Sequence, residues 1–260
     1  MRWPAHQITE EQVMKLNRSE IKQKAKQAIK GNIFSYFLVV IISSLITGSV
    51  SFVTSIATTV PTVISEIVMY ANDSYEPSMF MIIGALVLFI VSFVLGFIAT
   101  SCAQMSQMYA ALNIYDKSNC DISDVSYGYK HFKRAIAISL KQSIYIALWS
   151  MLFIIPGIIK TYEYSQAMYI SMDNPELSAE DCLKRSKKLM YGHKFELFVW
   201  GLSFCGWMIL SSFTCGILYI WLTPYMQSSL AGFYRELVNQ KDGSMFVESM
   251  ITDTGDFTEA

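Results

Sequence analysis

Stretches without a single charged residue dominate this chain. Three of them run for 35, 39 and 38 residues, at Gly31–Ser65, Pro77–Tyr115 and Leu197–Tyr234, and two shorter ones lie at Gln142–Ile159 and Tyr164–Met172. About 20 helical residues at 1.5 Å each cross a hydrocarbon core of about 30 Å, so each long stretch exceeds one membrane crossing. The helices of a soluble α-domain would instead show polar faces with a period near 3.6. The pattern predicts an all-α integral membrane protein.

The composition agrees with this class. Of the 260 residues, 53% are hydrophobic and 16% are charged, whereas about a quarter of the residues in an average soluble chain are charged. The formal net charge of −1 excludes a generally basic nucleic-acid binder and a charge-extended disordered chain. We therefore expect the lipid bilayer, and no nucleic acid, as a partner.

Prolines and charges divide the stretches into helices. Breaks are expected at Pro156–Gly157 and Leu222–Pro224, because proline cannot donate a backbone hydrogen bond. The prediction is a polytopic bundle of about six transmembrane helices in three hairpins, with spans at about 33–60, 79–112, 136–155, 158–172, 195–219 and 223–238. These spans make up a membrane domain over 32–238, between a cytoplasmic segment over 1–31 with an amphipathic helix and an acidic, mobile cytoplasmic tail over 239–260.

The distribution of lysine and arginine predicts the orientation in the cell membrane. The bases gather in four clusters: Arg2–Lys30, Lys117–Lys141, Lys184–Lys194, and Arg235 with Lys241. Basic residues near span ends favour the cytoplasmic side. Six spans with both termini in the cytoplasm put 19 of the 20 bases on that side. A form with five spans and an external tail stays open, because it would move only the last cluster outside.

Two segments that precede predicted spans resemble each other. Ser19–Gly31 aligns with Ser178–Gly192 at a shift of 161 positions, and Asp121–Arg134 is a weaker third copy. Both clear copies are amphipathic, with small and apolar residues opposite lysines. The apolar faces are Ile21, Ala25, Ala28 and Ile29 in the first copy and Cys182, Ser186, Leu189 and Met190 in the second. The repeat predicts three units, each an interfacial helix followed by a hairpin.

The lysine faces of these helices are candidate contacts to anionic lipid headgroups. They consist of Lys22, Lys26 and Lys30 in the first copy and Lys184, Lys187 and Lys188 in the second. Basic residues near an anionic surface contribute about 1 kcal/mol each. The alternative is a solvated helix next to the membrane that only follows the topology rule.

Conventional catalytic motifs are missing from the sequence. The three histidines are far apart, the five cysteines include no C-x-x-C pair, and no nucleotide-binding or hydrolase motif occurs. We therefore expect no catalytic residue, no cofactor and no metal site.

The candidate polar site within the membrane is Lys160, Glu163 and Tyr164. Lys160 and Glu163 are three positions apart, so on a helix they share a face and could pair. Lys160 is expected near the outer end of its span, where its side chain could also extend to the surface. The group is either a ligand or ion site or a structural pair.

Four motifs carry a resemblance to a known family. They are PGIIKTYEYSQAMY at Pro156–Tyr169, NPELSAEDCLKRSKKLMYGHK at Asn174–Lys194, FCGW at Phe204–Trp207 and PYMQSSLAGFYREL at Pro224–Leu237. Their order resembles a bacterial integral membrane family catalogued as domain of unknown function 975, from about Asn17 to Leu237. The resemblance implies a multi-span cytoplasmic-membrane protein and carries over no catalytic residue.

Two functions are compatible with these features. The first is a membrane scaffold or partner-binding subunit without enzymatic activity, with another membrane protein as its candidate partner. The alternative is a small-molecule or lipid transporter with a polar site near Lys160 and Glu163.

Overall fold

The computed structural model describes residues 18–71, 79–117, 119–214 and 217–254, and this part of the chain is helical without any strand. The elements are α2 (Arg18–Ile29), α3 (Ile33–Ala71), α4 (Met79–Lys117), the 3₁₀ helix η1 (Ile122–Asp124), α5 (Val125–Lys130), α6 (Phe132–Leu152), α7 (Ile154–Tyr164), α8 (Ala167–Asp173), α9 (Ala179–Leu189), α10 (Lys194–Phe213) and α11 (Ile217–Thr254). The predicted all-α class is confirmed. Four helices in the described residues are long and apolar enough to cross a membrane, over Ile33–Ile67, Ile82–Lys117, Phe132–Leu152 and Lys194–Phe213.

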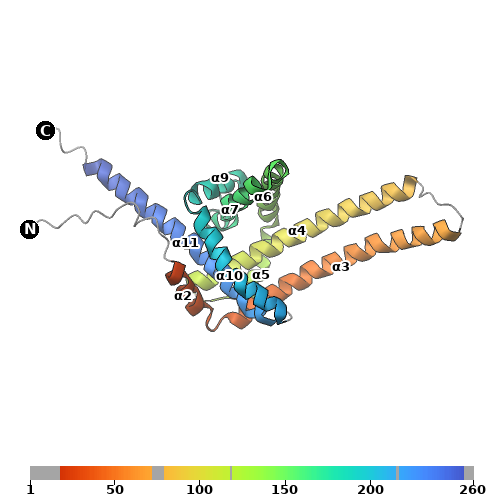
Figure 1. The fold of residues 1–260 in the computed structure, drawn as a ribbon, viewed down its shortest axis with the longest axis horizontal. Coiled ribbons are helices and arrows are strands. Elements are labelled where there is room, and N and C mark those ends of the chain that lie inside the picture. The colour runs from red at the N-terminus through yellow and green to blue at the C-terminus, as the bar shows by residue number, and fades with distance from the viewer. Residues whose placement is uncertain (1–17, 72–78, 118, 215–216, 255–260) are drawn as a thin grey trace, which may run out of the picture.

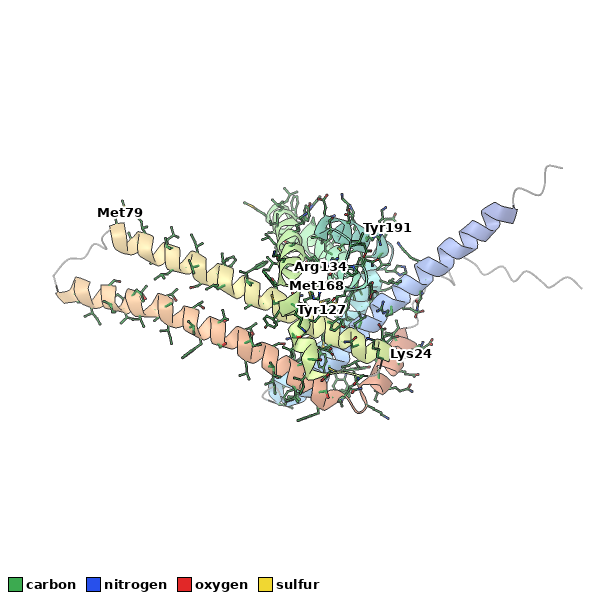
Figure 2. The ribbon with its side chains drawn as sticks, turned by 180° about the vertical axis from the view of Figure 1, so that it is seen from behind. Lys24, Met79, Tyr127, Arg134, Met168 and Tyr191 are labelled. Atoms are coloured by element: carbon green, nitrogen blue, oxygen red, sulfur yellow. The ribbon has the colours of Figure 1, made fainter. Side chains whose placement is uncertain are left out.

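Helices α3 and α4 form a long hairpin that projects from the rest of the molecule (Figure 1). We call the remainder, together with the inner ends of α3 and α4, the body. Seen from behind, Lys24 and Tyr191 lie on the side of the body away from Met79 at the hairpin tip (Figure 2). Helix α3 continues through Pro61 to Ala71, well past the predicted end at residue 60. The predicted connection of 61–78 is therefore helical over its first half, with α4 packed alongside.

The break predicted at Pro156–Gly157 lies at Phe153 instead. Phe153 has an extended backbone, with φ −155° and ψ 143°, between α6 and α7. Pro156 stands in the first turn of α7, where a missing N–H costs little because that donor has no partner within the helix.

The prediction of one continuous helix over 158–172 is wrong. Helix α7 ends at Tyr164, and α8 begins at Ala167 after a turn at Ser165 and Gln166. All residues from Ala167 to Met172 are buried. Helix α8 is therefore a core helix, and its apolar sequence reflects contact with protein on every side.

The break predicted at Leu222–Pro224 lies earlier in the chain, between the end of α10 at Phe213 and the start of α11 at Ile217. Helix α11 starts at Ile217 and runs through Pro224 without interruption, and its helical backbone reaches Thr254. The predicted tail over 239–260 is thus helical as far as Thr254, and residues 255–260 lie outside the described residues.

The repeat is visible in the structure at the predicted shift of 161. Helix α3 begins at Ile33 and α10 begins at Lys194, and the glycines before them, Gly31 and Gly192, have φ values of 99° and 86°. Only glycine adopts this conformation without strain. Burial repeats in the same register, in the pairs Ile21 and Cys182, Ala25 and Ser186, Ile29 and Met190, Tyr36 and Leu197, Val39 and Trp200, and Ser43 and Phe204. The third copy is shortened to the six residues of α5.

The apolar faces of α2 and α9 do not lie open to lipid, as an interfacial helix would require. Ile21, Ala25 and Ile29 are buried, as are Cys182 and Ser186. Helix α2 packs against α11 and α4, and α9 packs against α8 and α6. These faces hold the body together, so only the lysine faces are left to meet a membrane surface.

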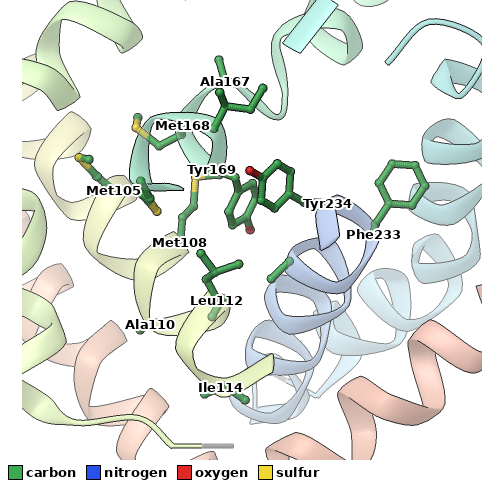
Figure 3. Close-up of a cluster of buried hydrophobic side chains, with 14 of the residues drawn as sticks. Met105, Met108, Ala110, Leu112, Ile114, Ala167, Met168, Tyr169, Phe233 and Tyr234 are labelled. Atoms are coloured by element: carbon green, nitrogen blue, oxygen red, sulfur yellow. The ribbon is translucent and has the colours of Figure 1, made fainter. Parts of the chain in front are cut away.

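The core of the body lies where the inner end of α4 meets α8 and α11 (Figure 3). Met105 and Met108 of α4 point toward Met168 and Tyr169 of α8, and Tyr169 stacks on Tyr234 of α11 with ring centroids 5.2 Å apart. Helices from three distant parts of the sequence therefore close one cluster.

Candidate functional site

Glu163 is the centre of the candidate polar site. It lies near the end of α7 and is 5% exposed. Lys160 Nζ donates to Glu163 Oε2 at 2.5 Å, and Lys194 Nζ donates to Oε1 at 2.5 Å. Lys160 is one turn away on the same helix, whereas Lys194 is the first residue of α10. The carboxylate therefore joins α7 to α10, and two ammonium groups share its charge.

Neighbouring groups hold this arrangement in place. The Ser186 hydroxyl of α9 donates to the backbone carbonyl of Glu163 at 2.7 Å, and the backbone N–H of Gln166 donates to Ser186 Oγ at 3.2 Å. The Lys160 ammonium lies 5.1 Å from the ring centroid of Trp149 on α6 and 5.9 Å from that of Tyr164. Such cation–π contacts stabilise an ammonium group away from water. Tyr164 thus contributes its ring face to the site.

The site lies at the base-rich end of the body. Lys194 opens α10, and Ser186 belongs to the lysine-bearing helix α9. Glu163 therefore sits at the level where α10 begins. The 11 residues of α7 bring the chain back toward α9 after about 16 Å. The expected place of Lys160 near the outer end of a span stays a prediction.

Lys194 and Trp149 were not predicted as members of this site. A sequence signal for Lys194 does exist, since it is the base that directly precedes a long apolar helix in the second repeat copy. Trp149 carries no such signal, because its position over Lys160 depends on how α6 and α7 pack.

A second charged cluster, also not predicted, surrounds Arg235 of α11. Its guanidinium donates from Nε to Asp116 Oδ1 at 3.0 Å and from Nη1 to Asp173 Oδ2 at 2.5 Å. The Tyr234 hydroxyl donates to the same Asp173 oxygen at 2.6 Å. Bidentate contacts of this kind fix geometry as well as charge. The cluster ties the ends of α4 and α8 to α11.

The sequence contained a signal for this second cluster. Asp116, Asp173 and Arg235 are each the first charged residue after an uncharged stretch, following Tyr115, Met172 and Tyr234. Three stretches therefore end at one point in space, where their terminal charges neutralise one another.

The lysines proposed as headgroup contacts fall into three surroundings. Lys22 Nζ donates to Ser203 Oγ of α10 at 2.6 Å and lies 4.7 Å from the ring centroid of Phe204. A cavity of about 90 Å³ is lined by Lys26, Ile29, Lys30, Ile33, Trp221 and Tyr225. A wider one of about 580 Å³ is lined by Lys184, Lys187, Lys188, Tyr191 and Lys241. Helix α11 contributes to the lining of both cavities, with Trp221 and Tyr225 at the first and with Lys241 at the second.

The cavities occupy matching places in the repeat. Lys26 and Lys30 of the first correspond to Lys187 and Tyr191 of the second at the shift of 161. Lys184 is also paired with Glu180 at 2.8 Å, and this contact raises the pKa of the Lys184 ammonium. Among the residues that the structure describes, no group of three or more His, Cys, Asp or Glu side chains is placed to hold a metal ion.

Comparison with known proteins adds one finding. Residues 152–241 match the model of a family described as "Protein of unknown function (DUF975)". No curated protein and no solved structure matches the chain significantly. The matched segment includes Glu163, Lys194 and Arg235, whereas Asp116 lies outside it. The family description names no activity, so it assigns no role to these residues. The resemblance is confirmed over this segment, since residues 152–241 are similar to the family of unknown function DUF975.

Proposed function

We propose that this protein is a multi-pass scaffold of the cell membrane that binds a partner membrane protein and catalyses no reaction. In this proposal α2, α9 and both termini face the cytoplasm, because the basic clusters gather around these helices. The described helices are long and apolar enough for the membrane location. Support for the scaffold role comes from charged side chains that join helices to one another.

The observation that carries the proposal is that the charged side chains of the body join helices to one another. Glu163 joins α7 to α10, Arg235 joins α11 to α4 and α8, and Arg134 of α6 donates to the backbone carbonyls of Asn174 and Leu177 before α9. A catalytic group would need a free reactive atom near a substrate. Here both Glu163 oxygens are occupied by lysines, which suits a rigid body that presents its surface.

Purification from native membranes tests this proposal. The full chain is crosslinked in its own membranes, extracted in mild detergent and analysed by native mass spectrometry. We expect one partner at fixed stoichiometry, missing from a control bait of similar abundance and span number. Recovery of the chain alone in repeated preparations would overturn the scaffold role.

The transporter alternative draws on a single observation, the excess positive charge around Glu163. Two ammonium groups face one carboxylate, so an anionic solute would be the favoured ligand. If the protein is a transporter, an anionic ligand should raise its melting temperature, and Glu163→Gln should change the size of that increase. A melting temperature that no anion in a broad panel changes would exclude it.

A further inference from the structure

Three long helices leave the body at equivalent positions. In α3 the last residue that the structure shows as buried is Ser43. Its repeat equivalent in α10 is Phe204, which is also buried. In α6 the corresponding level is near Lys141, which pairs with Glu180 of α9 at 3.6 Å. Each helix therefore spends about its first ten residues inside the body and is mostly exposed beyond that level, apart from the buried Ser211 of α10.

The free extensions differ greatly in length. Beyond Ser43, α3 continues for 28 residues to Ala71, or about 42 Å. Beyond Phe204, α10 has nine residues left, and beyond Gln142, α6 has ten, so each reaches about 15 Å. A hydrocarbon core is about 30 Å thick. Among the helices that the structure describes, only the α3–α4 hairpin extends far enough past the body to cross a hydrocarbon core, although α6 and α10 have sufficient total length.

The α6–α7 hairpin ends in a strongly apolar tip, where Met151 is 91% exposed. At the end of α10, Phe213 is 82% exposed between the polar residues Ser212 and Thr214. Around them lie further exposed apolar side chains: Leu148, Leu152, Phe153, Ile154, Ile155, Trp207, Ile209, Leu210, Tyr219 and Ile220. No charged residue occurs between Gln142 and Ile159 or between Leu197 and Tyr234. An outer headgroup region would tolerate polar turns, whereas the wholly apolar α6–α7 tip suits hydrocarbon.

In both short hairpins, the second helix returns to the part of the body from which the first helix extends. On the α7 side, Glu163 binds Lys194 at the start of α10, and the Tyr145 and Tyr164 rings lie 5.7 Å apart. On the α11 side, the Tyr225 ring lies 5.4 Å from that of Phe204. The returning limbs thus reach the base-rich end of the body after about ten residues.

The α6–α7 tip also limits the number of backbone groups without a partner. Phe153 is the one residue between the two helices, and its N–H donates to the Trp149 carbonyl at 3.0 Å. Pro156 in the first turn of α7 has no N–H to satisfy. Gly157 lets the limbs touch, since a Cβ there would lie 2.1 Å from Ser150 Oγ. Irregular backbone is costly in hydrocarbon, so a one-residue turn suits a buried tip.

We propose that α6–α7 and α10–α11 are re-entrant hairpins, which insert their apolar tips among the acyl chains of the cytoplasmic leaflet and return to the cytoplasmic face. Only α3 and α4 then cross the bilayer. The inference depends on the membrane location given under the proposed function, and it does not depend on the scaffold role. It replaces six crossings by two and places all 20 bases, including Lys160, on the cytoplasmic side.

Membrane depth along the hairpin tests this inference. Native cysteines are replaced by alanine, and single cysteines at Leu148, Met151, Phe153, Ile155 and Ile159 carry nitroxide labels. The full chain is placed in phosphatidylethanolamine and phosphatidylglycerol vesicles, and depth is read from collisions with oxygen and with a water-soluble nickel chelate. We expect the greatest depth at Phe153, with shallower positions on both limbs. Thr214→Cys should be similarly deep.

Two outcomes would overturn the proposal in distinguishable ways. A label at Phe153 that lies at the outer headgroups, with the deepest positions in the middle of α6, would show that the hairpin crosses. The matched control is Phe52→Cys on the free part of α3, which should lie deep in either case. If Phe52 is also accessible to the nickel chelate, the membrane location itself fails.

Discussion

Two charged clusters hold the body together, and they have opposite compositions. One carboxylate, Glu163, lies between two ammonium groups, whereas one guanidinium, Arg235, lies between two carboxylates. The Glu163 side chain is 6% exposed, while those of Arg235 and its partners are 26 to 31% exposed. Water can therefore share in neutralising the Arg235 cluster but hardly reaches Glu163. The comparison indicates that losing the buried ion pairs of Glu163 costs more folding free energy than losing the more exposed ion pairs of Arg235.

The largest effect is expected for Glu163→Gln. The amide cannot neutralise Lys160 and Lys194. The Lys160 side chain, which is 14% exposed, would lose its carboxylate in a mostly buried place, whereas water reaches Lys194, which is 33% exposed. Removing one side of a buried ion pair costs about 3 kcal/mol, which corresponds to a fall of roughly 8 °C in the melting temperature. Thermal unfolding in detergent, followed by tryptophan fluorescence, measures it. Glu66→Gln, an exposed change on α3, is the control, and an unchanged midpoint would contradict the assigned pairing.

A smaller loss is expected for Arg235→Gln. Asp116 and Asp173 would lose their shared base, but water reaches both carboxylates, so the loss should be about 2 kcal/mol. Arg235→Lys keeps the charge and loses the fork that binds both carboxylates, so about half of that loss should remain. In 1 M salt the Arg235→Gln effect should shrink, because the screening length falls to about 3 Å. A loss as large as that of Glu163→Gln would refute the ranking by depth.

The smallest expected effect is a local opening of the structure around Cys120, which can be measured as a change in the reactivity of its thiol. Burial raises the pKa of the Cys120 thiol to about 12 from an ordinary 9.0, with Asp124 and Asp121 adding to the shift. At pH 8 its thiolate fraction is therefore about a thousandfold lower than that of an ordinary thiol, so alkylation is slow and rises with pH. Cys120 follows the end of α4 that Arg235 holds through Asp116.

Breaking the Arg235 cluster should make Cys120 more reactive. In a variant with Cys120 as its single cysteine, Arg235→Gln should raise the maleimide labelling rate about tenfold, which corresponds to about 1.4 kcal/mol of local stability. Glu163→Gln should leave the labelling rate of Cys120 unchanged, because the ion pair that it removes joins α7 to α10 and not α4 to α11. Equal increases in both variants would indicate one cooperative unit in place of two local ties.

Much of the helical layout could be predicted from the sequence. Uncharged stretches located α3, α4, α6 and α10, and the lysine pattern located α2 and α9 in register with their buried faces. Ser178 and Asp181, three positions apart, are also typical of a helix start, and in the structure the Ser178 hydroxyl caps α9 by accepting from the Asp181 N–H at 3.2 Å. These features depend on residues close in sequence, where periodicity and capping chemistry act directly.

The errors arise where tertiary contacts override local signals. A break was expected at Leu222–Pro224 and the first span was expected to end at about residue 60, yet α11 continues through Pro224 and α3 through Pro61, because each packs along a neighbouring helix. The apolar run that ends at Met172 was taken for part of a membrane span, because a helix buried in protein and one buried in lipid have the same composition. The position of Lys194 beside Glu163 depends on a contact across 31 residues, which periodicity cannot reveal.

The Arg235 cluster also sets an order on biogenesis. Arg235 follows Asp116 by 119 residues and Asp173 by 62. A ribosome therefore delivers both carboxylates well before the arginine that they share. Until α11 emerges, the ends of α4 and α8 carry like charges that repel each other. Closure of the body around this cluster therefore requires the C-terminal helix α11, and a chain truncated before Arg235 would leave Asp116 and Asp173 without their shared base.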